Sequence, residues 1–140
     1  MTPGPTAPER VSLVVGGTKG IGRAVSLALA GAGPTFANYA HDADAAAALE
    51  VEAKDAGTPV VTLAGDISSK AGVDEVVDAV LGRAGRLDVV VFCAVDAYLV
   101  GALDATEDRW EQAMRTNAAP FLWLGQRMAG CATSGSGRLI

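Results

Sequence analysis

Three glycines follow the first apolar run of the chain at a spacing that suits the binding of phosphate groups. Gly16, Gly20 and Gly22 come after residues 11–15, and apolar residues at helical spacing follow them. A glycine loop between a strand and a helix brings backbone N–H groups close to a pyrophosphate, which the positive end of the helix also attracts. In this pattern Gly16 permits the tight turn, Gly20 the approach of the phosphates, and Gly22 the close packing of helix on strand. The same residues also fit a turn without a ligand, whereas a kinase-type phosphate loop is excluded because no Gly-Lys-Ser/Thr follows.

Residues at the end of the second apolar run bear on which dinucleotide would bind. An NAD-binding protein places an acid there to hold the ribose 2′-hydroxyl, but this chain has Asn38 and Tyr39. Asp42 stands further on, where it is better explained as the cap of the following helix. Lys19 and His41 could pair with a 2′-phosphate, because a cation attracts that group and a carboxylate repels it. A single loop histidine is more often only solvated, but together these residues favour NADP, used as NADPH, over NAD.

Short apolar runs alternate with helical patterns along the chain. The expected strands are residues 11–15, 35–39, 60–64 and 87–92, with 138–140 as the start of a fifth. The expected helix caps are Asp42 or Asp44, Ser69 and Thr106. The last helix is a long one over residues 106–130 that Pro120 would kink. This alternation predicts an α/β domain at residues 10–140, with a doubly wound parallel sheet, helices on both faces and a ligand site at the carboxyl ends of the strands. Residues 1–9 are expected to form a flexible tail.

Composition narrows the class of protein. The 140 residues are 50% hydrophobic and carry a net charge of −5, so the chain can bury a core and is a poor partner for nucleic acid. No apolar run is long enough to span a bilayer, and the N-terminus lacks the apolar segment of a signal peptide. Cys93 and Cys131 lie far apart, which argues against a disulfide framework or a metal site and favours a reduced, cytoplasmic chain.

Motifs beyond the glycine loop make the chain resemble the short-chain dehydrogenase/reductase family. The glycines match its TGxxxGxG pattern, with Val15 in place of the threonine. The other matching segments are Asp66-Ile67, where the family has an adenine-contacting Asp-Val pair, Gly85-Arg86-Leu87-Asp88, where it has GxLD, and Thr116-Asn117, which includes its catalytic asparagine. Within the family, Asn38-Tyr39-Ala40 is typical of the 3-oxoacyl- and the NADPH-dependent enoyl-acyl-carrier-protein reductases. The resemblance covers nearly all of residues 10–140 and implies a Rossmann-like fold.

The resemblance implies hydride transfer between NADPH and a carbonyl or enoyl group of a small-molecule or acyl-carrier-bound substrate. The implied cofactor-binding residues are Gly16, Thr18, Lys19, Gly20, Ile21, Gly22, Asn38, Tyr39, His41, Asp66, Ile67, Cys93 and Ala94. Asn117 is the implied catalytic residue, and the long helix at 106–130 is the implied contact of a homo-oligomer. The family's Ser and Tyr-x-x-x-Lys, which handle the substrate proton, are absent from this sequence. We therefore expect a C-terminally truncated domain that is inactive by itself.

Some of these residues have a second interpretation. Asn117 could instead satisfy backbone groups near the kink at Pro120. The segment 92–95, Phe-Cys-Ala-Val, replaces the family's Asn-Asn-Ala-Gly, so that Val95 could crowd a cofactor. Cys93 could be taken for a nucleophile, but without a basic partner it is better explained as a small buried apolar residue.

Two other functions stay open. A non-catalytic module would bind a dinucleotide or complete its sheet with a partner chain, which would cover otherwise exposed apolar faces. A methyltransferase that uses S-adenosylmethionine shares a glycine-rich first loop, but it would need an acid at the end of the second strand. Trp110, Phe121 and Trp123 are expected in a core or an interface rather than in a substrate pocket.

Overall fold

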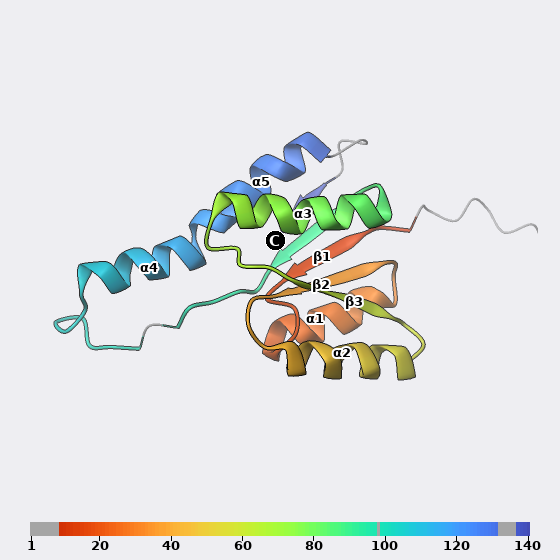
Figure 1. Cartoon of the computed structure of the whole chain (residues 1–140), viewed down its shortest axis with the longest axis horizontal. Helices are drawn as coiled ribbons and strands as arrows, with labels where there is room; N and C mark the ends of the chain where they lie inside the picture. Colours follow the sequence, from red (N-terminus) through yellow and green to blue (C-terminus); the bar gives the residue numbers. More distant parts are fainter. Residues whose placement is uncertain (1–8, 98, 132–136) are drawn as a thin grey trace, which may run out of the picture.

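Five parallel strands form the central sheet, in the order β3-β2-β1-β4-β5 (Figure 1). They are β1 (Ser12–Val15), β2 (Thr35–Tyr39), β3 (Val60–Ala64), β4 (Val89–Phe92) and β5 (Arg138–Leu139). The computed structural model describes residues 9–97, 99–131 and 137–140, so the predicted tail at 1–9 lies almost entirely outside the described residues. The strand order reverses between β1 and β4, which is where open sheets of this kind bind ligands.

Helices cover both faces of the sheet. α1 (Gly20–Ala30) and α2 (Ala43–Asp55) lie on one face, and α3 (Lys70–Ala84) and α5 (Ala119–Cys131) on the other (Figure 1). Valines and leucines of the strands pack on α3 and α5 to form the larger core, which includes Leu13, Val73, Val77, Val90 and Leu124. A smaller core of Ala37, Leu49, Ala53 and Val60 lies beneath α2. The predicted doubly wound, Rossmann-like parallel sheet is therefore confirmed.

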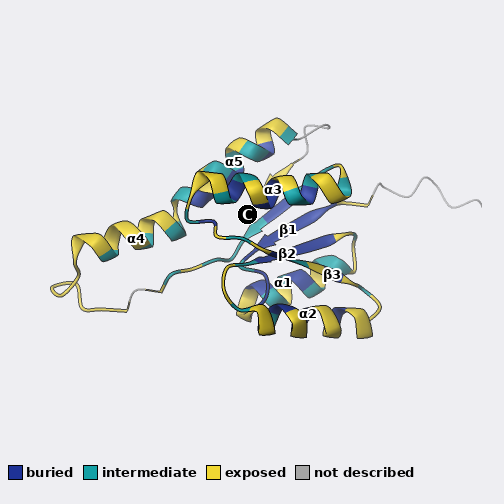
Figure 2. Cartoon of the chain, in the orientation of Figure 1, coloured by how far each residue is buried: buried dark blue, intermediate teal, exposed yellow. Residues whose placement is uncertain are grey.

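The predicted single long helix at 106–130 is wrong. Two helices occupy this stretch, α4 (Glu107–Asn117) and α5, and the helix breaks at Ala118, where φ is −121° and ψ is −48°. The physical reason is Pro120, which has no N–H to continue the helical hydrogen bonds and whose ring crowds the preceding turn. α4 extends away from the sheet and has no buried residue, and most of it is exposed in Figure 2.

The Arg-Leu-Asp motif before β4 fixes where that strand begins. β4 starts at Val89 rather than at the predicted residue 87, and the Asp88 carboxylate accepts a hydrogen bond from the Val11 backbone N–H at 2.9 Å. The Arg86 guanidinium donates two hydrogen bonds to the same carboxylate, at 2.9 and 2.7 Å. Burial raises the pKa of Asp88, but the bonds from Arg86 and Val11 outweigh it, so the pKa lies below its ordinary value. Asp88 thereby ties the end of the α3–β4 connection to the start of β1.

Local capping agrees with the sequence at two helices of three. Asp42 accepts a hydrogen bond from Ala45 N–H at 2.9 Å, and Ser69 accepts one from Gly72 N–H at 3.1 Å. α4 begins after Thr106 as predicted, but the Thr106 side chain does not accept the capping bond. Among the described helices, none combines the length and apolar character that crossing a bilayer requires. The described residues also contain no group of three or more His, Cys, Asp or Glu side chains that could hold a metal ion.

Candidate functional site

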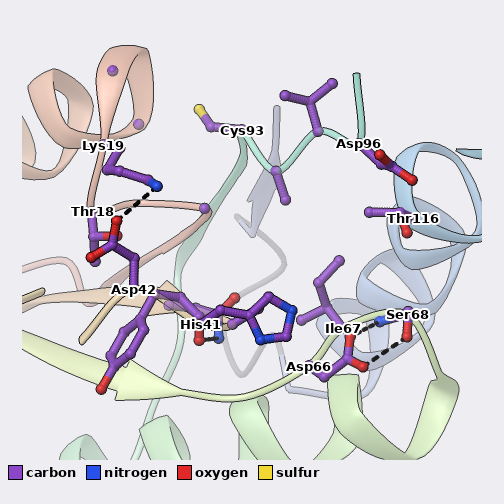
Figure 3. Close-up of a pocket in the computed structure, with 18 of the residues that line it drawn as sticks. Thr18, Lys19, His41, Asp42, Asp66, Ile67, Ser68, Cys93, Asp96 and Thr116 are labelled. Atoms are coloured by element: carbon purple, nitrogen blue, oxygen red, sulfur yellow. Dashed lines mark hydrogen bonds and ion pairs between the residues drawn. The ribbon is translucent and has the colours of Figure 1, made fainter. Parts of the chain in front are cut away.

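A cavity of about 800 Å³ opens where the carboxyl ends of β1 to β4 meet, and its volume falls within the roughly 300–1,000 Å³ of ligand sites (Figure 3). Its walls come from the glycine loop, the loops that follow β2 and β3, the segment after β4, and one side of α4. Every residue that the resemblance assigned to cofactor contact lies on these walls. Their contact with a cofactor stays a prediction, but the fold brings them together from four separate segments.

The glycine loop has the geometry that the spacing predicted. Gly16 has φ of +72°, and a Cβ there would lie 2.7 Å from the backbone N and Cα of Ala94. A Cβ on Gly22 would overlap the carbonyl oxygen of Gly16, so the start of α1 can approach the loop only without a side chain at Gly22. Gly20, with φ of +52°, has no heavy atom within 4 Å of a built Cβ, so its backbone is open to a ligand.

The N-terminus of α1 keeps donors for an anion. Lys19 is the N-cap residue and its side chain makes no capping hydrogen bond, so the first N–H groups of α1 are not satisfied by that side chain. These groups carry the partial positive charge of the helix end, which attracts phosphate. The glycine loop and the start of α1 therefore fit a pyrophosphate.

Two residues that support this loop were missed by the sequence interpretation. Gly17 donates its N–H to the carbonyl of Asn38 at 2.9 Å, and a Cβ on it would lie 2.7 Å from the carbonyl oxygen of Val14. The hydroxyl of Ser26, which is fully buried, donates to the carbonyl of Gly17 at 2.9 Å. The helical spacing of the apolar residues did not single out Ser26, and only the packed structure shows its bond to the loop.

The side chain of Asn38 is hydrogen-bonded to the backbone at the end of the neighbouring strand. Its amide nitrogen donates to the carbonyls of Leu63 at 3.1 Å and Gly65 at 3.0 Å, and the residue is 2% exposed. These bonds join the end of β2 to the end of β3. The residue therefore lines the cavity with its amide N–H groups already engaged by the sheet.

Lys19 and Asp42 form an ion pair at the cavity rim (Figure 3). Lys19 Nζ lies 2.9 Å from Asp42 Oδ2, while Asp42 Oδ1 accepts the capping bond from Ala45. The hydrogen bond from Lys19, followed by that from Ala45, keeps the pKa of Asp42 below its ordinary value. Asp42 thus does what was predicted of it, as a cap, and also holds the cation that was predicted to meet a 2′-phosphate.

Asp66 lies across the cavity from the glycine loop, on the side of His41 (Figure 3). Its carboxylate accepts hydrogen bonds from the Ser68 N–H at 2.9 Å and the Ser68 hydroxyl at 3.0 Å. The Ser68 N–H, then the Ser68 hydroxyl and to a smaller extent the charge of His41 lower the pKa of Asp66. The Ile67 side chain beside it is 5% exposed and belongs to the core. A charged acceptor next to an apolar side chain suits the edge and the face of a purine base.

The segment after β4 forms the upper wall in Figure 3. Cys93 donates its N–H to the carbonyl of Val15 at 2.8 Å, and burial raises the pKa of its thiol, so it stays protonated near neutral pH. This agrees with a packed thiol rather than a nucleophile. Val95 lines the cavity but is 72% exposed.

Asn117 does not line the cavity, but its side chain bonds to the backbone of Asp96, which does. Its Oδ1 accepts the Asp96 N–H at 2.7 Å, and its Nδ2 donates to the Asp96 carbonyl at 3.0 Å. Asn117 was expected to bond to backbone groups near Pro120. It does bond to backbone groups, but they belong to Asp96 and not to the kink. Its neighbours Gln112, Arg115 and Thr116 do face the cavity.

Comparison with known proteins identifies the class to which this fold and site belong. The family model for short chain dehydrogenases matches residues 10–140, and the chain belongs to that family. It is 33% identical over 133 residues to 1-cyclohexenylcarbonyl-CoA reductase of Streptomyces collinus, covering 94% of this chain and 47% of the relative. It is 37% identical over 116 residues to glucose and ribitol dehydrogenase homolog 2 of Arabidopsis thaliana, covering 77% of this chain and 40% of the relative.

Solved structures agree with the family and with the fold. A short-chain dehydrogenase/reductase from Serratia marcescens has a TM-score of 0.85 and 28% identity, covering 93% of this chain and 53% of that one. A short chain dehydrogenase from Burkholderia cenocepacia, solved in complex with NADP, has a TM-score of 0.85 and 26% identity, covering 94% of this chain and 54% of that one. The chain thus spans about half the length of these relatives.

Proposed function

We propose that this chain binds NADP(H) as the nucleotide-binding part of a short-chain reductase. The observation that carries the proposal is the cavity itself, in which an open glycine backbone and an uncapped helix N-terminus meet the carboxyl ends of four strands. Membership of the family and a similar structure solved in complex with NADP support the choice of ligand.

The residues present fit such a dinucleotide in three places. The amides from Gly16 to Gly22 would hold the pyrophosphate, and Asp66 with Ile67 would receive the adenine. Lys19 and His41 would meet the 2′-phosphate, since β2 itself ends without a carboxylate and the Lys19 side chain is 67% exposed at the cavity rim. Bound there, the dinucleotide would supply a hydride to a carbonyl carbon or an enoyl double bond.

The chain's own contribution at the reacting end is positional. Asn117 fixes the backbone of Asp96 and so shapes the wall between the strand ends and α4. Its catalytic role in a proton relay remains part of the proposal. Because this sequence contains no Tyr-x-x-x-Lys, we expect the 140-residue chain to bind nucleotide without turning over a carbonyl or acyl-carrier-bound substrate.

Calorimetric titration with NADPH and NADH tests the proposal. We expect NADPH to bind more tightly, and Lys19→Met to remove most of that preference. Lys70→Met is the matched control, because Lys70 is an exposed lysine outside the cavity that pairs with Asp74. Absence of heat with both nucleotides would refute the proposal.

We also propose that α4 and α5 pair with a second copy of the chain. Trp110, Met114, Phe121 and Leu122 are between 44% and 63% exposed on these helices, and a groove of about 520 Å³ runs beside them. Sedimentation velocity should show a dimer or larger species that Leu122→Glu dissociates. A monomer at every concentration would favour a partner of another kind or none.

The free thiols Cys93 and Cys131 support a reducing compartment such as the cytoplasm.

A further inference from the structure

We propose that Asp42 weakens the discrimination of this site between NADP(H) and NAD(H), by holding Lys19 in an ion pair with which a 2′-phosphate must compete. The inference rests on the proposed function, because it concerns the same nucleotide site. It assigns a specificity role to a residue whose position in the sequence indicated only a helix cap.

The geometry places the pair where the competition would occur. Lys19 belongs to the glycine loop and Asp42 to the loop that opens α2, 23 positions further along the chain. Both side chains line the cavity, and the ion pair bridges the two loops beside the end of β2 (Figure 3). The ribose of an adenine dinucleotide sits at this strand end in folds of this kind.

The charges on the cavity wall make this pair decisive. Arg115 and Asp96 line the opposite end, near α4, and Asp66 is already engaged by Ser68. Among the described wall residues near the end of β2, Lys19 is therefore the one permanently positive side chain. While Asp42 holds it, the Lys19–Asp42 pair has no net charge, and the Asp66 carboxylate stays negative because Ser68 is neutral, so that part of the wall has no excess positive charge to attract a phosphate.

Asp42 is also poorly placed to act as the ribose acid of an NAD-binding protein. Its Oδ1 accepts from Ala45 and its Oδ2 accepts from Lys19, so each oxygen already has a partner. The carboxylate therefore affects nucleotide choice through its charge and its hold on Lys19.

The substitution Asp42→Asn tests the negative charge of Asp42 separately from its role as a helix cap. An asparagine at this position keeps an oxygen for the Ala45 N–H and is as good an N-cap as aspartate. It removes the negative charge and releases Lys19 toward the cavity. We expect NADPH to bind about tenfold more tightly to this variant than to the unaltered chain, with NADH changed by less than about twofold.

Asp44→Asn is the matched control, since Asp44 lies in the first turn of the same helix but outside the cavity. It removes the same charge two positions away and should leave both affinities within about twofold. The gain from Asp42→Asn should shrink as salt rises from about 0.05 to about 0.5 M, because exposed charges are screened.

The outcomes separate the two proposals. If the unaltered chain binds neither nucleotide, the proposed function fails. If it binds NADPH but Asp42→Asn changes the ratio of the two affinities by less than about threefold, or raises NADH binding equally, this inference alone fails. Thermal melting monitored by circular dichroism shows whether the variant folds. Asp42→Ser, which also keeps a capping oxygen, repeats the test if it does not.

Discussion

Replacing Asn38 by aspartate should lower the stability of the folded protein and should not convert it to an NAD-binding form. NAD-binding proteins of this fold hold the ribose with an acid at the end of the second strand, so the substitution would be expected to favour NAD. In this structure, however, the Asn38 amide nitrogen faces the carbonyl oxygens of Leu63 and Gly65, at 3.1 and 3.0 Å, and the residue is 2% exposed. A carboxylate there would present a negative oxygen to two acceptors, with no donor between them.

The structure sets the size of the effect. Two hydrogen bonds worth about 1 kcal/mol each are lost, and leaving buried acceptors unpaired adds at least about 1 kcal/mol more. We expect Asn38→Asp to lower the free energy of unfolding by about 3 kcal/mol at pH 7, a large part of the roughly 5–15 kcal/mol that stabilises a domain. The midpoint of thermal unfolding should fall by about 10 °C.

The loss should also depend on pH. Burial and the two facing carbonyls would raise the pKa of the introduced carboxyl above its value of about 4 in the unfolded chain. The cost is therefore smallest below about pH 4, where the group is neutral and can donate to one carbonyl, and it grows as the pH rises to 7.

Urea unfolding followed by circular dichroism at pH 4 and pH 7 measures both effects. Ala40→Asp is the control, because Ala40 is exposed directly after the same strand and lines the cavity. It should change the free energy of unfolding by less than about 0.5 kcal/mol. A loss below about 1 kcal/mol for Asn38→Asp, or one equal to that of the control, would refute the assignment of Asn38 to the sheet.

Three further substitutions, with Gly82→Ala as a control, test other parts of the site and of the fold. Gly22→Ala should cost about 2–3 kcal/mol in urea unfolding and abolish NADPH binding, because its Cβ overlaps the loop carbonyl, whereas Gly82→Ala, with nothing within 4 Å, should stabilise its helix by roughly 0.5–1 kcal/mol. Asp88→Asn should cost about 2 kcal/mol at pH 7. Since the pKa of Asp88 is lowered by folding, its contribution is complete above about pH 5, and the difference from the unaltered chain should shrink as the pH falls below about 4. Asn117→Ala should remove the two bonds to Asp96 and speed hydrogen exchange of the α4 amides. Exchange in the sheet should stay unchanged, which would show that the loss of protection is local to α4.

Local patterns in the sequence predicted most of the fold because the features involved depend on few neighbouring residues. The glycine loop, the cap at Ser69 and the strand at Thr35–Tyr39 all follow from residues within a few positions of one another. The helix break at Ala118 shows the limit of that reasoning. Pro120 predicted a kink, but whether a helix bends or separates depends on what its two halves pack against. Here α5 packs against α3 and β5, whereas α4 extends away from the sheet and buries no residue.

The partners of polar side chains could not be predicted in the same way. Asn38 meets Gly65, 27 positions away, and Asn117 meets Asp96, 21 positions away. A side chain at the end of a strand can face the cavity or a neighbouring loop, and only the packed sheet decides between them. The residue types were therefore informative about location but not about contact.

The polar residues around the cavity fall into two groups, those that bond to backbone groups of the protein and those that could contact a ligand. Where parallel strands end, their connecting loops leave the ladder of backbone hydrogen bonds, and buried backbone groups then need side-chain partners. Asn38 and Asn117 supply these partners, so their substitution should act first on stability and on the position of α4. Lys19 and Asp42 pair with each other at the cavity rim, so substitutions there that keep the capping oxygen of Asp42 should act on ligand affinity with little effect on folding. Because α4 buries no residue of its own, the bonds from Asn117 to Asp96 and the ion pair between Arg109 and Asp96 connect its position to the cavity wall.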